Sequence, residues 1–141
     1  GLAHAKFDAM EQKELLQNVN DETLLVAMIE TPEAGDKADE IASVDGIDVL
    51  LIGTNDLSTG MGITGQHDHP KVNKVYDQVI EACTKHGKTP GMGGSYKPDL
   101  IEQRISEGMR FILSGSDLNF MIAGASAQAK MIREAAKKSG V

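Results

Sequence analysis

The sequence predicts an α/β protein of four successive βα units, which is the number in one half of a TIM (β/α)₈ barrel. Two observations support this: short apolar runs alternate with segments of helical periodicity, and 141 residues fall well short of the roughly 250 that a complete barrel needs. Such alternation implies a parallel sheet, either doubly wound or closed into a barrel. We therefore expect residues 1–141 to form a single partial domain, and because the chain starts at Gly1 we expect a fragment or a processed chain.

Four runs are predicted as strands. Leu24–Ile29 and Ile47–Ile52 are almost wholly apolar, as is typical of parallel strands buried on both faces. Phe111–Leu113 is shorter but of the same kind. Thr89–Gly93 is rich in glycine, and only its position between two predicted helices indicates a strand.

The segments between these runs are predicted as helices. Pro32 and Glu33 suit the first turn of a helix that we expect to run from Thr31 to about Val44 with Ile41 turned inward. Further helices are predicted at about Ala9–Val19, from His69 to Gly87, from Lys97 to Gly108 and from Asp117 onward. The last helix is expected to bury a stripe made of Leu118, Met121, Ile122, Ala125 and Ile132.

Composition excludes several classes of protein. Fourteen basic against 21 acidic residues give a net charge of −7 without a basic cluster, which argues against a nucleic-acid partner. No apolar run approaches the roughly 20 residues needed to span a bilayer, and no leader is apparent, so we expect a soluble, cytoplasmic protein with no membrane partner. The single cysteine, Cys83, excludes an internal disulfide and is expected to be a buried structural thiol.

Two acidic residues follow neighbouring predicted strands. Glu30 comes directly after the first strand, and Asp56 lies in the segment Gly53-Thr54-Asn55-Asp56 that ends the second. Because active sites of parallel α/β proteins lie at the carboxyl ends of their strands, these carboxylates could converge on a hard cation such as Mg²⁺ or Mn²⁺. The alternative is that Glu30 caps the following helix and Asp56 lies in a solvated turn.

Other polar segments are less specific. Gly60, Gly62 and Gly65 match a dinucleotide-binding pattern in spacing, but no helix starts there, and we expect residues 53–65 to form a mobile loop whose amides can face an anion. The pair His67 and His69 is expected to cap or pack at a helix start more readily than to bind a metal. Residues 114–117 (SGSD) could hold an anion or simply cap the last helix.

A series of motifs runs from about Asn20 to the last predicted helix. They are Met28–Ala34 (MIETPEA), Gly46–Val49 (GIDV), Ile52–Ser58 (IGTNDLS), Met61–Gly62, His69–Pro70, Gly87–Gly91 (GKTPG), Gly108–Phe111 (GMRF) and Gly115–Asp117 (GSD). In order and spacing they resemble the HpcH/HpaI aldolase family, the metal-dependent pyruvate aldolases of the phosphoenolpyruvate/pyruvate barrel superfamily. The resemblance implies the C-terminal half of such a barrel.

The resemblance also implies an activity and a site. Glu30 and Asp56 would be the two protein ligands of a divalent metal, Mg²⁺ or Mn²⁺ with Co²⁺ as another candidate, and a 2-oxo acid such as pyruvate would chelate it. The enzyme would be a class II aldolase, a carbon–carbon lyase that cleaves or forms 4-hydroxy-2-oxo acids with an aldehyde as the second partner. The implied substrate-binding residues are Gly53, Thr54, Asn55, Asp56, Met92 and Gly93.

The chain departs from the family pattern in two respects. The family's ketone-polarising arginine and its histidine base lie in the first half of the barrel, so we expect this chain to hold the metal ligands but to be inactive alone. Thr54-Asn55 replaces a more frequent Pro-Ala pair, a change that a loop acting through its backbone should tolerate. Family members also form oligomers, so we expect a homo-oligomer or pairing with the missing barrel half, with the small residues Gly124–Ala127 permitting close helix contact.

Two alternatives stay open at this point. A citrate-lyase-like CoA-ester lyase would share the barrel and the acidic site but needs a basic groove, for which the βα loops offer little beyond Lys71, Lys74 and Lys97. The other is a non-catalytic remnant that binds a metal or a 2-oxo acid.

Overall fold

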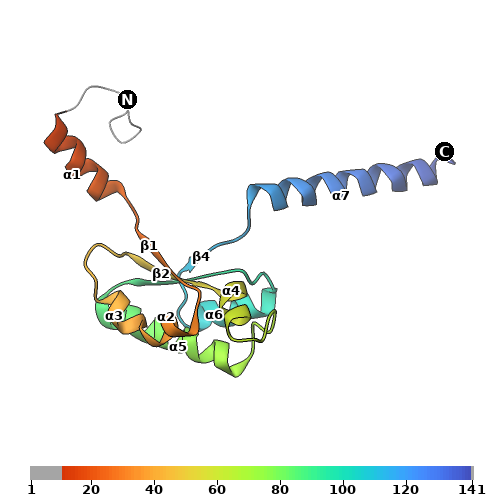
Figure 1. Cartoon of the computed structure of the whole chain (residues 1–141). Helices are drawn as coiled ribbons and strands as arrows, with labels where there is room; N and C mark the ends of the chain where they lie inside the picture. The colour runs from red at the N-terminus through yellow and green to blue at the C-terminus, as the bar shows by residue number, and fades with distance from the viewer. Residues whose placement is uncertain (1–10, 141) are drawn as a thin grey trace.

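The computed structural model describes residues 11–140 and confirms a four-stranded parallel sheet in the order β1-β2-β3-β4 (Figure 1). The strands are β1 (Val26–Ile29), β2 (Val49–Gly53), β3 (Thr89–Gly93) and β4 (Phe111–Ile112). Ile29 pairs with Ile52, Ile52 with Met92 and Met92 with Ile112. Neighbours in the sequence are therefore neighbours in the sheet, as in a barrel.

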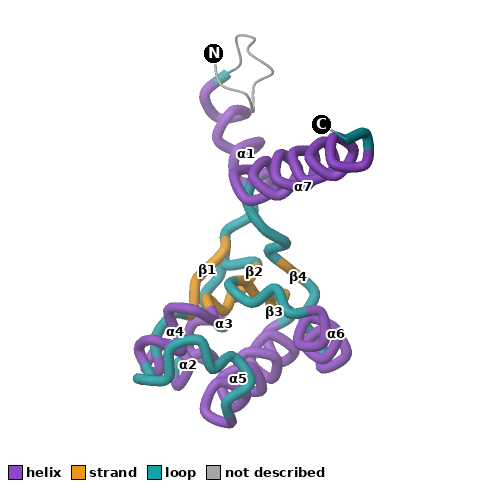
Figure 2. The backbone as a smooth tube through the Cα atoms, turned by 90° about the vertical axis from the view of Figure 1, so that its right-hand side faces the viewer, coloured by secondary structure: helices purple, strands orange, loops and turns teal. Residues whose placement is uncertain are grey.

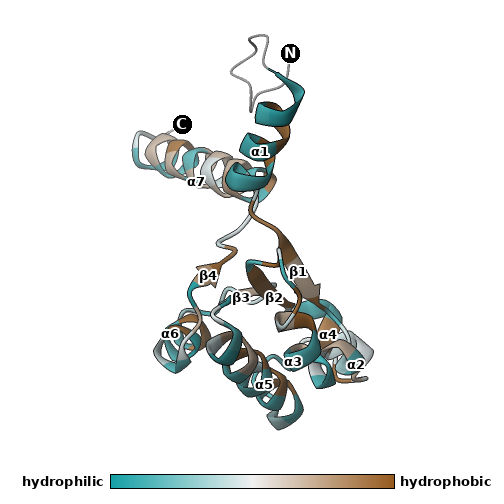
Figure 3. Cartoon of the chain, turned by 90° about the vertical axis from the view of Figure 1, so that its left-hand side faces the viewer, coloured by the Kyte–Doolittle hydropathy of each residue, from teal (hydrophilic) through white to brown (hydrophobic). Residues whose placement is uncertain are grey.

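The helices that follow the strands are α2 (Pro32–Asp36), α3 (Ala38–Ala42), α4 (Thr54–Gly60), α5 (Pro70–His86) and α6 (Pro98–Glu107). In Figures 1 and 3, α2, α3, α5 and α6 lie on one face of the sheet and leave the other face open. A doubly wound sheet carries helices on both faces, so the arrangement is that of half a (β/α)₈ barrel.

The structure corrects two predicted segments. The helix expected from Thr31 to Val44 is two short helices, because Lys37 has a non-helical backbone (φ −102°, ψ 14°) between α2 and α3. The loop expected at residues 53–65 starts with α4, which follows β2 without an intervening residue. In α5, by contrast, the expected end is observed, since Gly87 takes the left-handed conformation (φ 66°) that favours glycine.

The core lies between the sheet and the helices. Every second strand residue faces the helices, and Ile29, Leu50, Ile52 and Met92 are at most 1% exposed. The apolar face of α5 packs against them through Val72, Val75, Tyr76, Val79 and Cys83. Burial raises the pKa of the Cys83 thiol, in keeping with its expected structural role.

Two helices extend away from this body (Figure 2): α1 (Gln12–Glu22) and α7 (Asp117–Lys138). The stripe expected to be buried on α7 is not buried, since Leu118, Met121, Ile122 and Ile132 are 54–65% exposed and no described residue covers them. The expected start of the first helix, Ala9, lies outside the described residues. Within residues 11–140, no helix combines the length and the apolar composition that a membrane crossing requires.

Gly35 offers a test of the packing between α2 and α5. A Cβ atom at this position would lie 2.9 Å from both methyl groups of Val75, so Gly35→Ala must push the two helices apart. We expect the substitution to lower the free energy of unfolding by about 1–3 kcal/mol, measured by urea denaturation. Gly124→Ala is the matched control: nothing lies within 4 Å of its Cβ position on α7, so it should leave stability unchanged or raise it.

Candidate active site

Glu30 lies at the carboxyl end of β1 with its side chain on the open face of the sheet. Its neighbour Ile29 is fully buried against the helices, so strand alternation turns Glu30 the other way. The side chain lies across Gly53 at the end of β2: a Cβ on Gly53 would be 2.9 Å from Cγ of Glu30 and 3.0 Å from Oε1. The helix cap is Thr31, whose hydroxyl accepts from the Ala34 N–H (3.1 Å), so Glu30 does not serve as the cap.

Asp56 lies three residues beyond Gly53, in the first turn of α4. It is exposed and belongs to a helix rather than to a turn. Because β1 and β2 are adjacent and parallel, Glu30 at the end of β1 and Asp56 just after β2 lie at the same end of the sheet. The structure thus places both predicted metal ligands at the end where parallel α/β proteins bind their ligands.

The end of β3 completes this region with residues that have little or no side chain. At Gly93 a Cβ would lie 3.0 Å from Cδ1 of Leu113, and at Gly94 (φ 82°) it would lie 3.1 Å from both the backbone N and the Nδ2 of Asn55. The start of α4 and the loop after β3 are therefore in contact. Ser95 follows; it is 4% exposed, and its hydroxyl has no hydrogen-bond partner among the described residues.

Two predicted substrate-binding residues direct their side chains elsewhere. Met92 is 1% exposed and packs in the core against the helices, because it occupies the strand position between Gly91 and Gly93, which face the open side. Thr54 is also 1% exposed, and its hydroxyl is 2.7 Å from the hydroxyl of Tyr76 on α5. Only their backbone atoms can reach a ligand on the open face.

A buried polar network, which sequence patterns did not reveal, supports the start of α4. Tyr76 connects Thr54 to Arg104 on α6, whose guanidinium lies 4.0 Å from the centre of the Tyr76 ring. Arg104, 2% exposed, donates to Glu107 (2.7 Å) and to the side-chain oxygen of Asn73. Burial raises the pKa of Tyr76, so the phenol stays neutral. The network fixes α4 relative to α5 and α6.

The histidines of the described part do not complete a metal cluster. His69 caps α5, its Nδ1 accepting from the N–H of Lys71 (3.1 Å), as expected. His67 is half-buried, and burial together with nearby Lys97 lowers its pKa. Residues 11–140 contain no group of three or more His, Cys, Asp or Glu side chains placed to hold a metal ion. Ser116 caps α7 by accepting from Asn119 (3.4 Å), which agrees with the simpler of the two expectations for residues 114–117.

Comparisons with known proteins fit this geometry. A family model described as HpcH/HpaI aldolase/citrate lyase matches residues 4–124. The chain is 39% identical over 103 residues to 4-hydroxy-4-methyl-2-oxoglutarate aldolase from Hapsidospora irregularis, across 72% of this chain and 38% of that protein. It is 35% identical over 114 residues to 4-hydroxy-2-oxo-heptane-1,7-dioate aldolase from Salmonella paratyphi C (strain RKS4594), across 81% of this chain and 43% of that protein.

Among solved structures, an HpcH/HpaI aldolase from Desulfitobacterium hafniense DCB-2 superposes with a TM-score of 0.77 at 29% identity. The match covers 92% of this chain and 50% of that one. The chain therefore spans about two fifths of the length of the curated relatives it matches and half of this structure.

The buried network predicts a specific coupling between Thr54 and Tyr76. Tyr76→Phe leaves the buried Thr54 hydroxyl without its partner and should lower the free energy of unfolding by about 1–2 kcal/mol. Adding Thr54→Val should cost less than the sum of the single changes, because both partners are then gone. Tyr96→Phe, at a side chain 51% exposed, is the control and should be neutral. Strictly additive losses in urea denaturation would show that the two hydroxyls are not coupled.

Proposed function

This chain belongs to the HpcH/HpaI aldolase/citrate lyase family, and from that premise we propose that it forms the metal-binding part of an aldolase that cleaves or forms 4-hydroxy-2-oxo acids. Two of the relatives it matches are aldolases of 4-hydroxy-2-oxo acids. The observation that supports the proposal most directly is the Glu30 carboxylate lying over Gly53 at the end of the sheet, with Asp56 in the first turn of the helix that follows.

Glu30 and Asp56 would hold the divalent metal. Both supply carboxylate oxygens, which are the ligands that Mg²⁺ and Mn²⁺ prefer, and no thiol lies near enough to favour a softer ion, since Cys83 is buried in the core. When bound, the cation would act as a Lewis acid toward the ketone oxygen of a 2-oxo acid, where negative charge develops as the carbon–carbon bond breaks. Two protein ligands would leave coordination positions for the substrate.

The surrounding residues would position the 2-oxo acid through their backbone. Glycines at positions 53, 93 and 94 keep the end of the sheet free of side chains, which leaves space next to the two carboxylates. The N–H groups of Asn55 and Asp56, at the start of α4, would donate hydrogen bonds to the substrate carboxylate. Gly93 and the backbone of Met92 would border the aldehyde. The network beneath Thr54 would keep these amides in place during the reaction.

Proton transfer and polarisation of the ketone would come from an arginine and a histidine outside residues 1–141, as the family resemblance implies. The same outside segment would cover the open face, where Met28 is 51% and Leu113 is 40% exposed. The exposed apolar residues of α7 would be covered by a second copy of the protein. Stable soluble proteins expose few large apolar patches, so a covering partner would explain why these apolar residues are exposed in this chain.

The metal site predicts a selective loss of affinity. Glu30→Gln and Asp56→Asn should each weaken Mn²⁺ binding at least about tenfold, because each removes one charged oxygen ligand. Isothermal titration calorimetry measures the effect. Glu33→Gln is the charge-matched control, since Glu33 is exposed on α2 only three residues away. If all three variants bind Mn²⁺ equally, Glu30 and Asp56 are not the ligands.

Gly53→Ala extends this test without removing a ligand. Its new methyl group would meet Cγ and Oε1 of Glu30 at about 3 Å and displace the carboxylate, so Mn²⁺ affinity should fall several-fold. Gly60→Ala, where the nearest outside atom would be 3.5 Å away, should leave the affinity unchanged. Circular dichroism of both variants controls for the fold.

If the metal ligands lie in this chain and the base and arginine lie outside it, the chain should bind a 2-oxo acid without catalysing the reaction. With Mn²⁺ present, the 141-residue chain should bind pyruvate in calorimetry but should release no pyruvate from 4-hydroxy-2-oxo-heptane-1,7-dioate above the rate with metal alone. The reason is the absence of a proposed base and arginine from its own residues. Full aldolase activity of this chain would overturn the proposal that those groups lie outside it.

A further inference from the structure

The turn that joins α3 to β2 contains Asp45 followed by Gly46, and nowhere else in the 141 residues does a glycine follow an aspartate. Both residues are exposed. Because β1 and β2 run parallel, this turn lies at the end of the sheet opposite to Glu30. The proposed aldolase reaction uses neither residue, so the turn raises a separate question of chemistry.

The backbone nitrogen of Gly46 is unhindered and accessible to water. Its φ of 88° lies in the region that favours glycine, and apart from its chain neighbours no atom lies within 4 Å of the position that a Cβ would take. Its N–H donates no hydrogen bond to any residue between 11 and 140. An exposed N–H of this kind is hydrated, so it can exchange its proton with water.

The Asp45 carboxylate is also free, in contrast to that of Asp48. Asp45 forms neither a hydrogen bond nor an ion pair through its side chain with the described part of the chain. The carboxylate of Asp48 accepts from the N–H of Leu25 (2.8 Å). The residue after Asp48 is the branched Val49, whose N–H donates to the carbonyl of Leu25 (3.2 Å).

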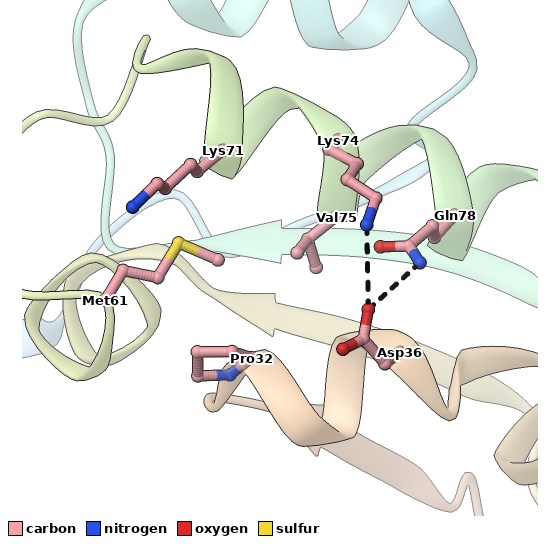
Figure 4. Close-up of a pocket in the computed structure, with 7 residues that line it drawn as sticks. All are labelled: Pro32, Asp36, Met61, Lys71, Lys74, Val75 and Gln78. Atoms are coloured by element: carbon pink, nitrogen blue, oxygen red, sulfur yellow. Dashed lines mark hydrogen bonds and ion pairs between the residues drawn. The ribbon is translucent and has the colours of Figure 1, made fainter.

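Asp36 is held in the same way as Asp48. Figure 4 shows its carboxylate in the hollow between α2 and α5, where it accepts from Nε2 of Gln78 (3.4 Å) and lies 3.9 Å from Nζ of Lys74. The N–H of the next residue, Lys37, donates to two carbonyls of α2 (3.2 Å each). In the turn before β2, by contrast, both the carboxyl group and the following nitrogen are free to react.

We propose that Asp45 is a modification site, at which aspartate converts to isoaspartate through a cyclic succinimide. The deprotonated nitrogen of Gly46 attacks Cγ of the Asp45 carboxyl group, a C–O bond breaks, and one water leaves as the five-membered ring closes. Water then opens the ring at either carbonyl. Opening at the α-carbonyl gives isoaspartate, in which the main chain passes through Cγ. The water lost in the first step is regained in the second, so neither a cofactor nor an oxidant is needed.

The chain after the turn is held firmly enough to keep its fold when the backbone becomes one atom longer at Asp45. Asp48 donates through its N–H to the carbonyl of Leu25 (3.0 Å), and its own carbonyl accepts from the N–H of Thr89 (2.9 Å). The entry to β2 is therefore bonded to both neighbouring strands. The exposed turn takes up the extra atom, and the product presents a free α-carboxylate to solvent.

The test is incubation of the 141-residue chain at neutral pH and physiological temperature, with EDTA present so that no metal acts on it. Tryptic peptide 38–71 is then analysed by electron-transfer dissociation, which distinguishes isoaspartate from aspartate. Isoaspartate should accumulate at Asp45, after a transient species that is lighter by one water, and not at Asp48. Urea denaturation of the incubated chain should match that of the fresh chain. A synthetic peptide of residues 41–50 is the positive control for detection.

Two variants assign the reaction to its groups. Asp45→Glu should abolish the signal, because glutamate would have to close a six-membered ring. Asp68→Glu changes another exposed aspartate of the same peptide, one that precedes His69, and should leave the accumulation at Asp45 unaltered. The proposal is overturned if the incubated chain contains no isoaspartate at Asp45, or if Asp48 and Asp68 isomerise equally fast. A loss of urea stability that grows with the isoaspartate content would overturn the inference that the turn takes up the extra atom.

Discussion

The pairing of β1 with β2 is the constraint on which the site depends. Ile29 lies opposite Ile52 in the parallel register, and both are fully buried against the helices. The next residue on each strand must therefore face the open side, and these residues are Glu30 and Gly53. Because Gly53 has no side chain, the Glu30 carboxylate can lie across the end of β2. A shift of one residue in this register would bury the carboxylate in the core.

The sequence predicted the βα units, the two acidic residues and their common end of the sheet, because apolar runs and strand ends are visible in a linear pattern. It did not predict that the side chains of Thr54 and Met92 point into the core and away from the site. Thr54 turns toward Tyr76 because α5 presents a hydroxyl there, and that contact joins residues 22 apart. Met92 could have been assigned to the core from the strand alternation, since its neighbours Gly91 and Gly93 face the other way.

The first predicted helix is replaced by two short helices, α2 and α3, which both contact α5. Gly35 allows Val75 of α5 to approach α2 more closely than a side chain would permit, and the chain leaves helical geometry two residues later at Lys37. Residues 31–44 contain one proline, Pro32, which lies in the first turn of a helix, and one glycine, Gly35, so the pattern gives no clear sign of a break. Local propensity therefore predicted one helix, whereas the structure has two, α2 and α3.

For the last helix, α7, the sequence predicted the helix correctly but not the exposure of its apolar stripe. An apolar stripe on a helix predicts burial only if a surface is available to cover it, and α7 has none among residues 11–140. Its helical form has local support: Ser116 caps its start, Asp117 lies in the first turn, and Lys137 and Lys138 lie in the last. Twenty-two residues also exceed the roughly 12–15 below which an isolated helix is marginal. Local sequence thus accounts for the helix itself, whereas the burial of its apolar stripe depends on a surface that this part of the chain does not provide.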